Sequence, residues 1–157
     1  MAASVYLETT IISYLAALPS RDLVVAAHQE ITRQWWRDRR QDFDMFVSAL
    51  VVREVRAGNP EAVRRRLEIL EGIPSLGLTE EARALGRRLV ETGAVSYAAR
   101  ADSLHIAVAT VHGVDYLVTW NCRHIANAES RSRIVRTCHL LGYAAPILCT
   151  PEELMGE

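Results

Sequence analysis

The chain has 157 residues, of which 50% are hydrophobic and 24% are charged, a composition typical of one globular domain with its own core. It contains no apolar run near the roughly 20 residues needed to cross a bilayer. Its first residues, MAASVYLETT, lack the basic flank and long apolar core of a signal peptide. We therefore expect a protein of the cytoplasm that does not bind membranes.

The net charge is −1, and all 18 basic side chains are arginines, because the chain has no lysine. This excludes a P-loop, a Schiff-base enzyme and the lysine partner of a receiver-type aspartate. Arginine grips phosphate well, although coding bias is the simpler explanation of its use here. Cys122, Cys138 and Cys149 are odd in number and lack paired metal-ligand spacing, so we expect reduced thiols.

Strand and helix patterns alternate along the whole chain. In chain order, the patterns predict a strand at 4–7, a helix from Thr9 to Pro19, a helix from Val24 that ends in the polar stretch 37–42, a strand at 43–47, helices at 48–57 and 60–71, a weak strand at 75–78, helices at 79–91 and 96–112, a strand at 116–119, helical segments over 124–141, a strand at 146–149 and a short helix at 151–154. Thr9 and Thr10 are expected to cap the first helix. Alternation of this kind predicts an α/β fold with a parallel sheet covered on both faces.

Two glutamates lie where this sheet could gather acids. Glu54 projects between Leu50 and Val51 at about 100° per residue, so it lies in an apolar stripe, where a carboxylate is costly unless paired or bound to metal. A buried ion pair with a distant arginine is the alternative. Glu8 directly follows the first strand, and its alternative is a purely capping role, because a helix N-terminus favours an anion.

Asp102 begins a helix whose continuation, LHIAVATV, is apolar almost all round and therefore expected to be buried. The acid could simply satisfy the helix dipole. His105 lies one turn on and could share its environment, although such a histidine is more often packed and hydrogen-bonded.

Asn121 follows the strand at 116–119 and offers an uncharged oxygen to a metal or phosphate, or acts only as a turn residue. Arg123 and His124 would then lie near the next helix start, where a phosphate could bind. Ligands of open parallel sheets bind outside the carboxyl ends of the strands. The coincidence of polar residues at these exits therefore predicts a site for hard metal ions.

The chain resembles PIN-domain proteins of the VapC toxin-like group. The matching pieces are VYLETTIISYL at the start, VSALVVREV around Glu54, ADSLHIAVA around Asp102 and YLVTWNCRHIAN around Asn121. The resemblance covers nearly the entire chain and implies a single PIN-like domain over 1–157, a three-layer α/β/α sandwich with a central parallel sheet. It further implies an acidic pocket for Mg²⁺ or Mn²⁺, endoribonuclease activity, a homodimer and inhibition by a small antitoxin protein.

The resemblance also assigns roles to single residues. Glu54 and Asp102 match the acids expected of the family directly, and Thr9 matches the hydroxyl residue often found after the first acid. Glu8 stands where the family usually has aspartate, and Asn121 stands where an aspartate or a neutral polar residue is found. The implied catalytic residues are therefore Glu8, Glu54, Asp102 and Asn121, the implied metal ligands are Glu8, Glu54 and Asp102, and the substrate contacts are Thr9, Arg123 and His124.

Two hypotheses follow. The first is a metal-dependent ribonuclease that is the toxin of a type II toxin–antitoxin pair and cuts RNA. The second is a PIN-like module that binds RNA or protein with weakened or lost catalysis, because Glu8 changes ligand reach and Asn121 lowers the negative charge of the pocket. A dinucleotide-binding oxidoreductase is disfavoured, because the first turn, LETTIIS, contains no glycine.

Two surface features have their own predictions. Arg64, Arg65 and Arg66 lie on a helix beside glutamates and are expected to form a solvated face with salt bridges. Trp35 and Trp36 point in different directions on another helix, so we expect a partner or dimer contact at the exposed one.

Overall fold

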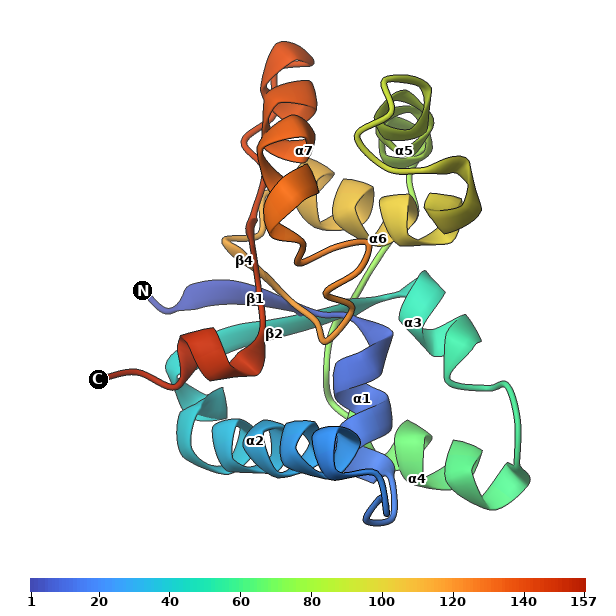
Figure 1. The fold of residues 1–157 in the computed structure, drawn as a ribbon, viewed down its shortest axis with the longest axis vertical. Coiled ribbons are helices and arrows are strands. Elements are labelled where there is room, and N and C mark those ends of the chain that lie inside the picture. The colour runs from blue at the N-terminus through green and yellow to red at the C-terminus, as the bar shows by residue number, and fades with distance from the viewer.

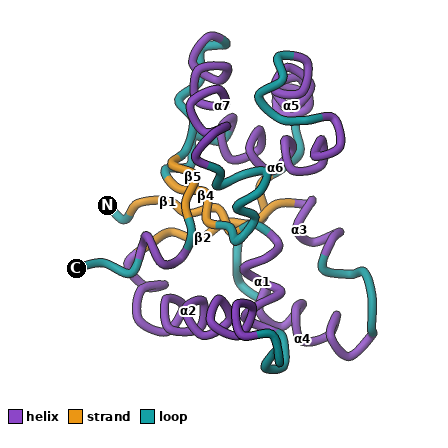
Figure 2. Tube along the Cα trace, viewed as in Figure 1, coloured by secondary structure: helices purple, strands orange, loops and turns teal.

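A five-stranded parallel sheet forms the centre of the molecule (Figure 1, Figure 2). The computed structural model describes residues 1–157. The strand order is β3-β2-β1-β4-β5, and each neighbouring pair is parallel. The strands are β1 (Ala3–Leu7), β2 (Phe43–Ser48), β3 (Ser75–Leu76), β4 (Tyr116–Val118) and β5 (Ile147–Cys149). All five lie where the sequence predicts strands, and the predicted parallel sheet is confirmed.

Helices cover both faces of this sheet. They are α1 (Thr9–Ala16), α2 (Leu23–Arg39), α3 (Ala49–Glu54), α4 (Pro60–Leu70), α5 (Glu80–Glu91), α6 (Arg100–Val111) and α7 (Ala128–Leu140). Figure 1 shows α1, α2 and α4 on one side and α5, α6 and α7 on the other, with α3 at the end of β2. Three short 3-10 helices complete the chain: η1 (Arg40–Asp42), η2 (Tyr97–Ala99) and η3 (Pro151–Leu154). The predicted α/β/α architecture is therefore confirmed.

Two helices begin later than the sequence pattern suggests. The predicted helix at 96–112 opens with the 3-10 turn η2, and α6 starts only at Arg100. The segment predicted to be helical from 124 becomes α7 only at Ala128. Its N-cap is Asn127, whose side-chain oxygen accepts hydrogen bonds from the amides of Glu129 and Ser130. The residues before it form turns rather than helix, because the Asn121 carbonyl accepts the amides of residues 125 and 126.

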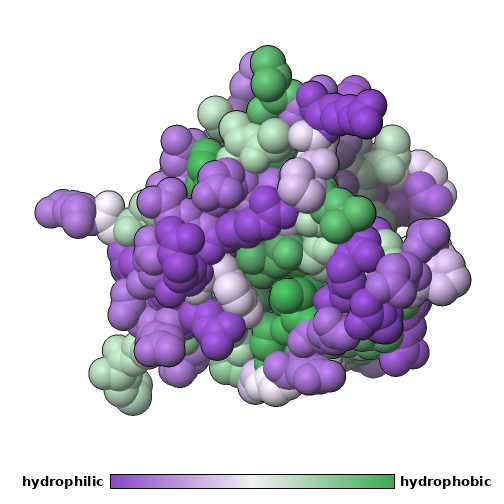
Figure 3. Space-filling view, turned by 90° about the horizontal axis from the view of Figure 1, so that it is seen from below, coloured by the Kyte–Doolittle hydropathy of each residue, from purple (hydrophilic) through white to green (hydrophobic).

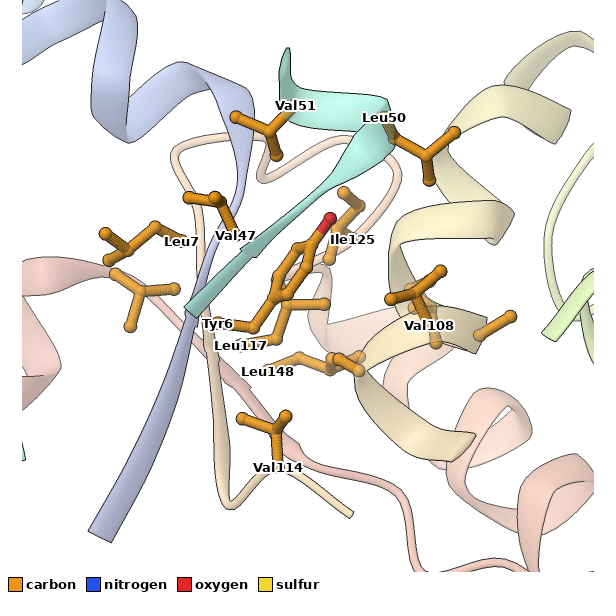
Figure 4. Packing of buried hydrophobic residues seen from close by; sticks show 14 of the residues in the cluster. Tyr6, Leu7, Val47, Leu50, Val51, Val108, Val114, Leu117, Ile125 and Leu148 are labelled. Atoms are coloured by element: carbon orange, nitrogen blue, oxygen red, sulfur yellow. The ribbon is translucent and has the colours of Figure 1, made fainter. Parts of the chain in front are cut away.

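The core is built around the central strand. Val5, Tyr6 and Leu7 of β1 are fully buried, because the strand has neighbours on both edges and helices on both faces. Figure 4 shows the Tyr6 ring among aliphatic side chains, with its hydroxyl directed between Leu50 and Ile125. A phenol buried in this way must find hydrogen-bond partners inside the protein.

The surface agrees in part with the sequence predictions. Arg64 pairs with Glu61 and Glu68 on the exposed face of α4, as predicted. Trp35 is fully buried, whereas Trp36 is half-buried, and the Arg40 guanidinium lies 5.0 Å from its ring centroid. The partner contact at Trp36 stays a prediction.

The underside of the molecule, where α2 and α4 lie, carries apolar atoms in its middle, framed by hydrophilic side chains (Figure 3). No helix combines the length and apolar character that crossing a membrane requires.

Candidate active site

The carboxyl ends of β1, β2 and β4 lie side by side, because these strands are adjacent and parallel. Glu8 follows β1, α3 with Glu54 follows β2, and the segment Thr119 to Asn121 follows β4. The predicted site residues of the first two strands therefore meet those of the third at one edge of the sheet. This is the edge at which parallel α/β folds bind ligands.

Glu8 is 5% exposed and connects the first turn of α1 to the residue that follows β4. Its Oε1 accepts hydrogen bonds from the Thr10 hydroxyl at 2.6 Å and from the Thr119 hydroxyl at 2.5 Å. The Thr10 hydroxyl oxygen in turn accepts the backbone amide of Trp120 at 2.9 Å. The Thr10 hydroxyl thus bonds Glu8 and the loop after β4. The sequence predicted that Thr10 caps α1, and this prediction is wrong. The N-cap of α1 is Glu8 itself, without a side-chain capping bond.

Glu54 shares a face of α3 with the buried Leu50 and Val51, as the helical projection predicts, but its predicted burial is wrong. It is the last residue of α3, and its side chain is 40% exposed. Its partner is a histidine and not an arginine: His105 Nε2 lies 2.5 Å from Glu54 Oε1. The Thr9 hydroxyl donates to the same oxygen at 2.7 Å.

The pKa of Glu54 reflects these contacts. Burial raises the pKa of this carboxyl, but the hydrogen bond of His105, the positive charge of that ring when it is protonated, the hydrogen bond of Thr9 and the charge of Arg53 together lower the pKa by more. The balance places the pKa below the usual value for glutamate, so the group is ionised at neutral pH. Thr9 acts here as a partner of Glu54, and its predicted contact with substrate stays a prediction.

His105 is 1% exposed, and it is packed and hydrogen-bonded, which was the more usual role that the sequence analysis gave to such a histidine. Its Nδ1 lies 2.6 Å from the Tyr6 hydroxyl, which also lies 2.7 Å from Ser48 Oγ. Neither Tyr6 nor Ser48 was predicted from the sequence. The available signal was His105 itself, a histidine in a largely apolar buried helix, whose ring nitrogens must find partners from other elements.

Asp102 lies in the first turn of α6, one turn before His105, and is partly exposed. Residues three apart on a helix lie on one face, so Asp102 is on the face of α6 that reaches Glu54 through His105. Its carboxylate accepts no hydrogen bond within the chain, so both oxygens are available to a ligand. Asp102 makes no direct hydrogen bond to Glu8 or Glu54.

The chemistry of these donors fits a hard cation. Glu8 and Glu54 each use Oε1 for both hydrogen bonds, so Oε2 of each accepts none within the chain. Carboxylate oxygens are the ligands that Mg²⁺ and Mn²⁺ prefer. No three Asp, Glu, His or Cys side chains stand together as a group that could hold a metal ion on their own. Metal binding by Glu8, Glu54 and Asp102 therefore stays a prediction.

Asn121 acts as a turn residue in this structure. Its side-chain Oδ1 accepts the backbone amide of His124 at 3.0 Å, and its backbone amide donates to the Thr119 hydroxyl at 2.9 Å. The amide oxygen is therefore already engaged by backbone, which was the alternative left open by the sequence. A catalytic role for Asn121 stays a prediction.

Arg123 and His124 line one pocket of about 330 Å³ between the loop at 93–96 and the start of α7. Arg133 and Ser130 of α7 complete its polar wall, together with Glu129. The structure thus groups Arg123 and His124, two of the three residues that the sequence proposed as substrate contacts. Thr9 does not belong to this pocket.

The three cysteines are free thiols, as predicted. Cys122 is exposed in the loop after β4, whereas Cys138 and Cys149 are buried. Burial raises the pKa of Cys149 to about 12, with a smaller contribution from Glu153, so this thiol is protonated and unreactive at neutral pH.

Comparisons with known proteins identify the fold. No family model matches the chain, and no curated protein matches it. A chain from VapBC2 of Rickettsia felis, solved bound to a DNA fragment of its promoter, is 16% identical with a TM-score of 0.60, over 93% of this chain and 97% of that one. VapC20 of Mycobacterium tuberculosis, described as a sarcin–ricin loop cleaving toxin, is 17% identical with a TM-score of 0.55, over 73% of this chain and 87% of that one. The chain has the PIN-like fold of VapC proteins.

Proposed function

We propose that the protein is a metal-dependent endoribonuclease, the toxin of a type II toxin–antitoxin pair. The observation that carries this proposal is the pair of carboxylates at the carboxyl edge of the sheet. The Thr10 hydroxyl donates a hydrogen bond to Glu8, and the Thr9 hydroxyl donates one to Glu54. Each carboxylate keeps one oxygen that accepts no hydrogen bond within the chain. The fold it shares with a toxin that cleaves the sarcin–ricin loop adds support.

In this proposal Glu8, Glu54 and Asp102 hold Mg²⁺ or Mn²⁺ together with water and substrate phosphate. This suits Mg²⁺, which is usually bound by one or two carboxylates and keeps several waters. When bound, the ion supplies Lewis acidity toward a phosphodiester oxygen and toward the attacking water. His105 and Thr9 keep Glu54 ionised and oriented, and Thr10 and Thr119 do the same for Glu8.

RNA contacts are proposed at the pocket of Arg123, His124 and Arg133. Guanidinium groups bind phosphate oxygens in a bidentate manner, and the pocket follows β4, next to the loop that contacts Glu8 through Thr119. The arginines would draw the RNA backbone toward an edge whose acids repel it when no metal is present. Asn121 connects the two regions through its bonds to Thr119 and His124.

A small antitoxin and a second copy of the chain are the proposed partners. Support comes from the likeness to a chain of VapBC2. Trp36 offers one surface for such a contact, beside a pocket of about 430 Å³ that includes Met45 and Ile69.

A binding module with lost catalysis is the second candidate. It is favoured by Asn121, which adds no charge and whose amide oxygen is engaged in a turn, and by the lack of a ready-made group of three metal-binding side chains.

Cleavage of a structured RNA with Mn²⁺ tests the two candidates against each other. The ribonuclease proposal predicts that the wild-type protein cleaves the RNA and that Glu54→Gln and Asp102→Asn do not. Circular dichroism checks that each variant is folded. Equal inactivity of the wild-type protein and both variants, across several RNAs with Mg²⁺ and Mn²⁺, would favour the binding module.

A further inference from the structure

A continuous chain of hydrogen bonds connects the core to Glu54. It begins at Ser48, the last residue of β2, whose Oγ lies 2.7 Å from the hydroxyl of Tyr6 in β1. The Tyr6 hydroxyl lies 2.6 Å from Nδ1 of His105 in α6. The chain ends with His105 Nε2, 2.5 Å from Oε1 of Glu54 at the end of α3. Four residues from four separate elements are thus joined in one line.

This line lies almost entirely inside the protein. Tyr6 and Ser48 are fully buried, and the His105 side chain is 2% exposed. In Figure 4 the Tyr6 hydroxyl is directed toward the aliphatic side chains of Leu50 and Ile125. Buried polar groups cost free energy unless all of them are paired, and a fully satisfied network fixes one arrangement. The line is therefore a rigid connection.

The direction of each hydrogen bond follows from the chemistry of the two ends. The carboxylate of Glu54 can only accept, so Nε2–H of His105 donates to it. In a neutral imidazole the other nitrogen, Nδ1, then accepts, so the Tyr6 hydroxyl donates to Nδ1. Tyr6 Oη accepts in turn from the Ser48 hydroxyl, whose oxygen also accepts the amide of Leu50 at 3.2 Å. Every donor in the line is used once.

We propose that Tyr6 and His105 are positioning residues that set the orientation of the Glu54 carboxylate: Tyr6 fixes the tautomer of His105, and His105 fixes Oε1 of Glu54. Thr9 saturates the same oxygen, so Oε2 is the atom turned toward a ligand. That this ligand is a divalent metal rests on the proposed function. The positioning itself does not.

This chain of hydrogen bonds gives a reason for the presence of His105 and Tyr6 in a core that aliphatic residues could fill. Partners that hold a metal-binding side chain in place typically contribute 10–100-fold to metal affinity or activity. Tyr6 makes no hydrogen bond to Glu54, so the hydrogen-bonded route from its hydroxyl to Glu54 passes through His105.

The test compares Tyr6→Phe with Tyr116→Phe, a matched control on the adjacent strand β4 whose ring packs edge-on against Phe43. Nuclear magnetic resonance of protein labelled with ¹⁵N-histidine reports the His105 tautomer, and ¹³C-glutamate labelling reports the Glu54 carboxylate. The wild-type protein and Tyr116→Phe should show His105 protonated at Nε2. Tyr6→Phe should shift the Nδ1 signal, mix the two tautomers and move the Glu54 carboxylate signal.

A second pair of variants, at His105, tests the hydrogen bond between His105 and Glu54 directly. In His105→Gln the side-chain amide can still donate to Glu54, so the Glu54 signal should stay closer to wild type than in His105→Ala. His112→Gln is the control, on an exposed histidine directly after α6 that bonds the Gly77 carbonyl. Because His105→Gln keeps a donor to Glu54 and leaves Tyr6 unchanged, it serves as the test if Tyr6→Phe does not unfold cooperatively.

Binding of Mn²⁺, measured by calorimetry on the same variants, separates the two proposals. We expect about 10-fold weaker binding in Tyr6→Phe and no change in Tyr116→Phe. A His105 tautomer and a Glu54 signal unchanged in Tyr6→Phe would overturn the positioning proposal, whatever the metal affinity. Wild-type protein that binds no Mn²⁺ and cuts no RNA, with the expected signal changes in Tyr6→Phe, would reject the metal-dependent nuclease and uphold the positioning.

Discussion

The two halves of the candidate site are built differently. On the side of β1, α3 and α6, the carboxylates of Glu8 and Glu54 are each held by two hydrogen bonds, and the partners reach into the core. On the side of β4 and α7, Arg123 is exposed, and the side-chain oxygen of Asn121 already accepts the His124 amide. The first half suits a cation at a fixed position, whereas the second suits the phosphates of a flexible substrate. Substitutions in each half should therefore have different effects.

The largest effect is expected from the first half. Glu54→Gln and Glu8→Gln keep the size of each side chain and an oxygen acceptor but remove the charge. Because the supporting partners of a metal ligand are worth 10–100-fold, loss of a direct ligand should lower the rate of RNA cleavage by at least about 100-fold. Initial rates at saturating RNA and Mn²⁺ measure this. Glu30→Gln, on the exposed surface of α2 without an ion pair, is the control.

The second half should affect binding more than the chemical step. We expect Arg123→Ala and Arg133→Ala to raise KM for RNA about 10-fold with kcat nearly unchanged, because their guanidinium groups line the proposed phosphate pocket. Arg136→Ala, also exposed on α7 but outside that pocket, should behave as wild type. Removing one arginine that binds a phosphate should also reduce the slope of log affinity against log salt by roughly 0.7 for single-stranded RNA. A fall in kcat alone would contradict the assignment.

A negative charge added after β4 should make the second half of the site contribute to cation binding, as the first half is proposed to do. Asn121→Asp preserves the acceptor for the His124 amide and adds one negative charge beside Thr119. Because the number of charged ligands tunes the affinity for divalent cations, Mn²⁺ binding should strengthen on the order of a few-fold. Calorimetric titration measures the change. Unchanged Mn²⁺ binding would mean that Asn121 lies outside the reach of the metal site.

The smallest effect is on stability in acid. The pKa of Glu54 is lower in the folded protein than in the unfolded chain, so the folded state binds fewer protons at mildly acidic pH. Its contribution to the free energy of unfolding is complete above the unfolded pKa of about 4.3 and is lost as the pH falls through the lower folded value. Urea unfolding of the wild-type protein and Glu54→Gln from pH 6 to pH 3 should show the steeper decline in wild type. Parallel curves would argue against the pairing of Glu54 with His105.

The sequence was sufficient for the features set by local pattern. The apolar runs predicted the five strands, and their alternation with helices predicted the parallel sheet that brings Glu8 and the residues after β4 to one edge. The pocket of Arg123 and His124 could be anticipated because both residues follow a strand by a few positions.

Features that depend on distant contacts could not be read from local pattern. The burial of Glu54 was misjudged, because periodicity predicts the face of a helix but not that α3 ends at this residue, whose side chain is 40% exposed. The pairing of Glu54 with His105 depends on how α3 and α6 pack. Thr10 was expected to cap a helix, and only the approach of β4 shows that its hydroxyl serves Glu8 and the Trp120 amide instead.

A crystal structure of the protein grown with Mn²⁺, with anomalous scattering recorded at the manganese edge, tests the central claim most directly. The account predicts an anomalous peak in contact with Oε2 of Glu8 or Glu54 and with the carboxylate of Asp102, and no such peak in Glu54→Gln. Absence of the peak at saturating Mn²⁺, or a peak bound only by residues outside this edge of the sheet, would contradict it.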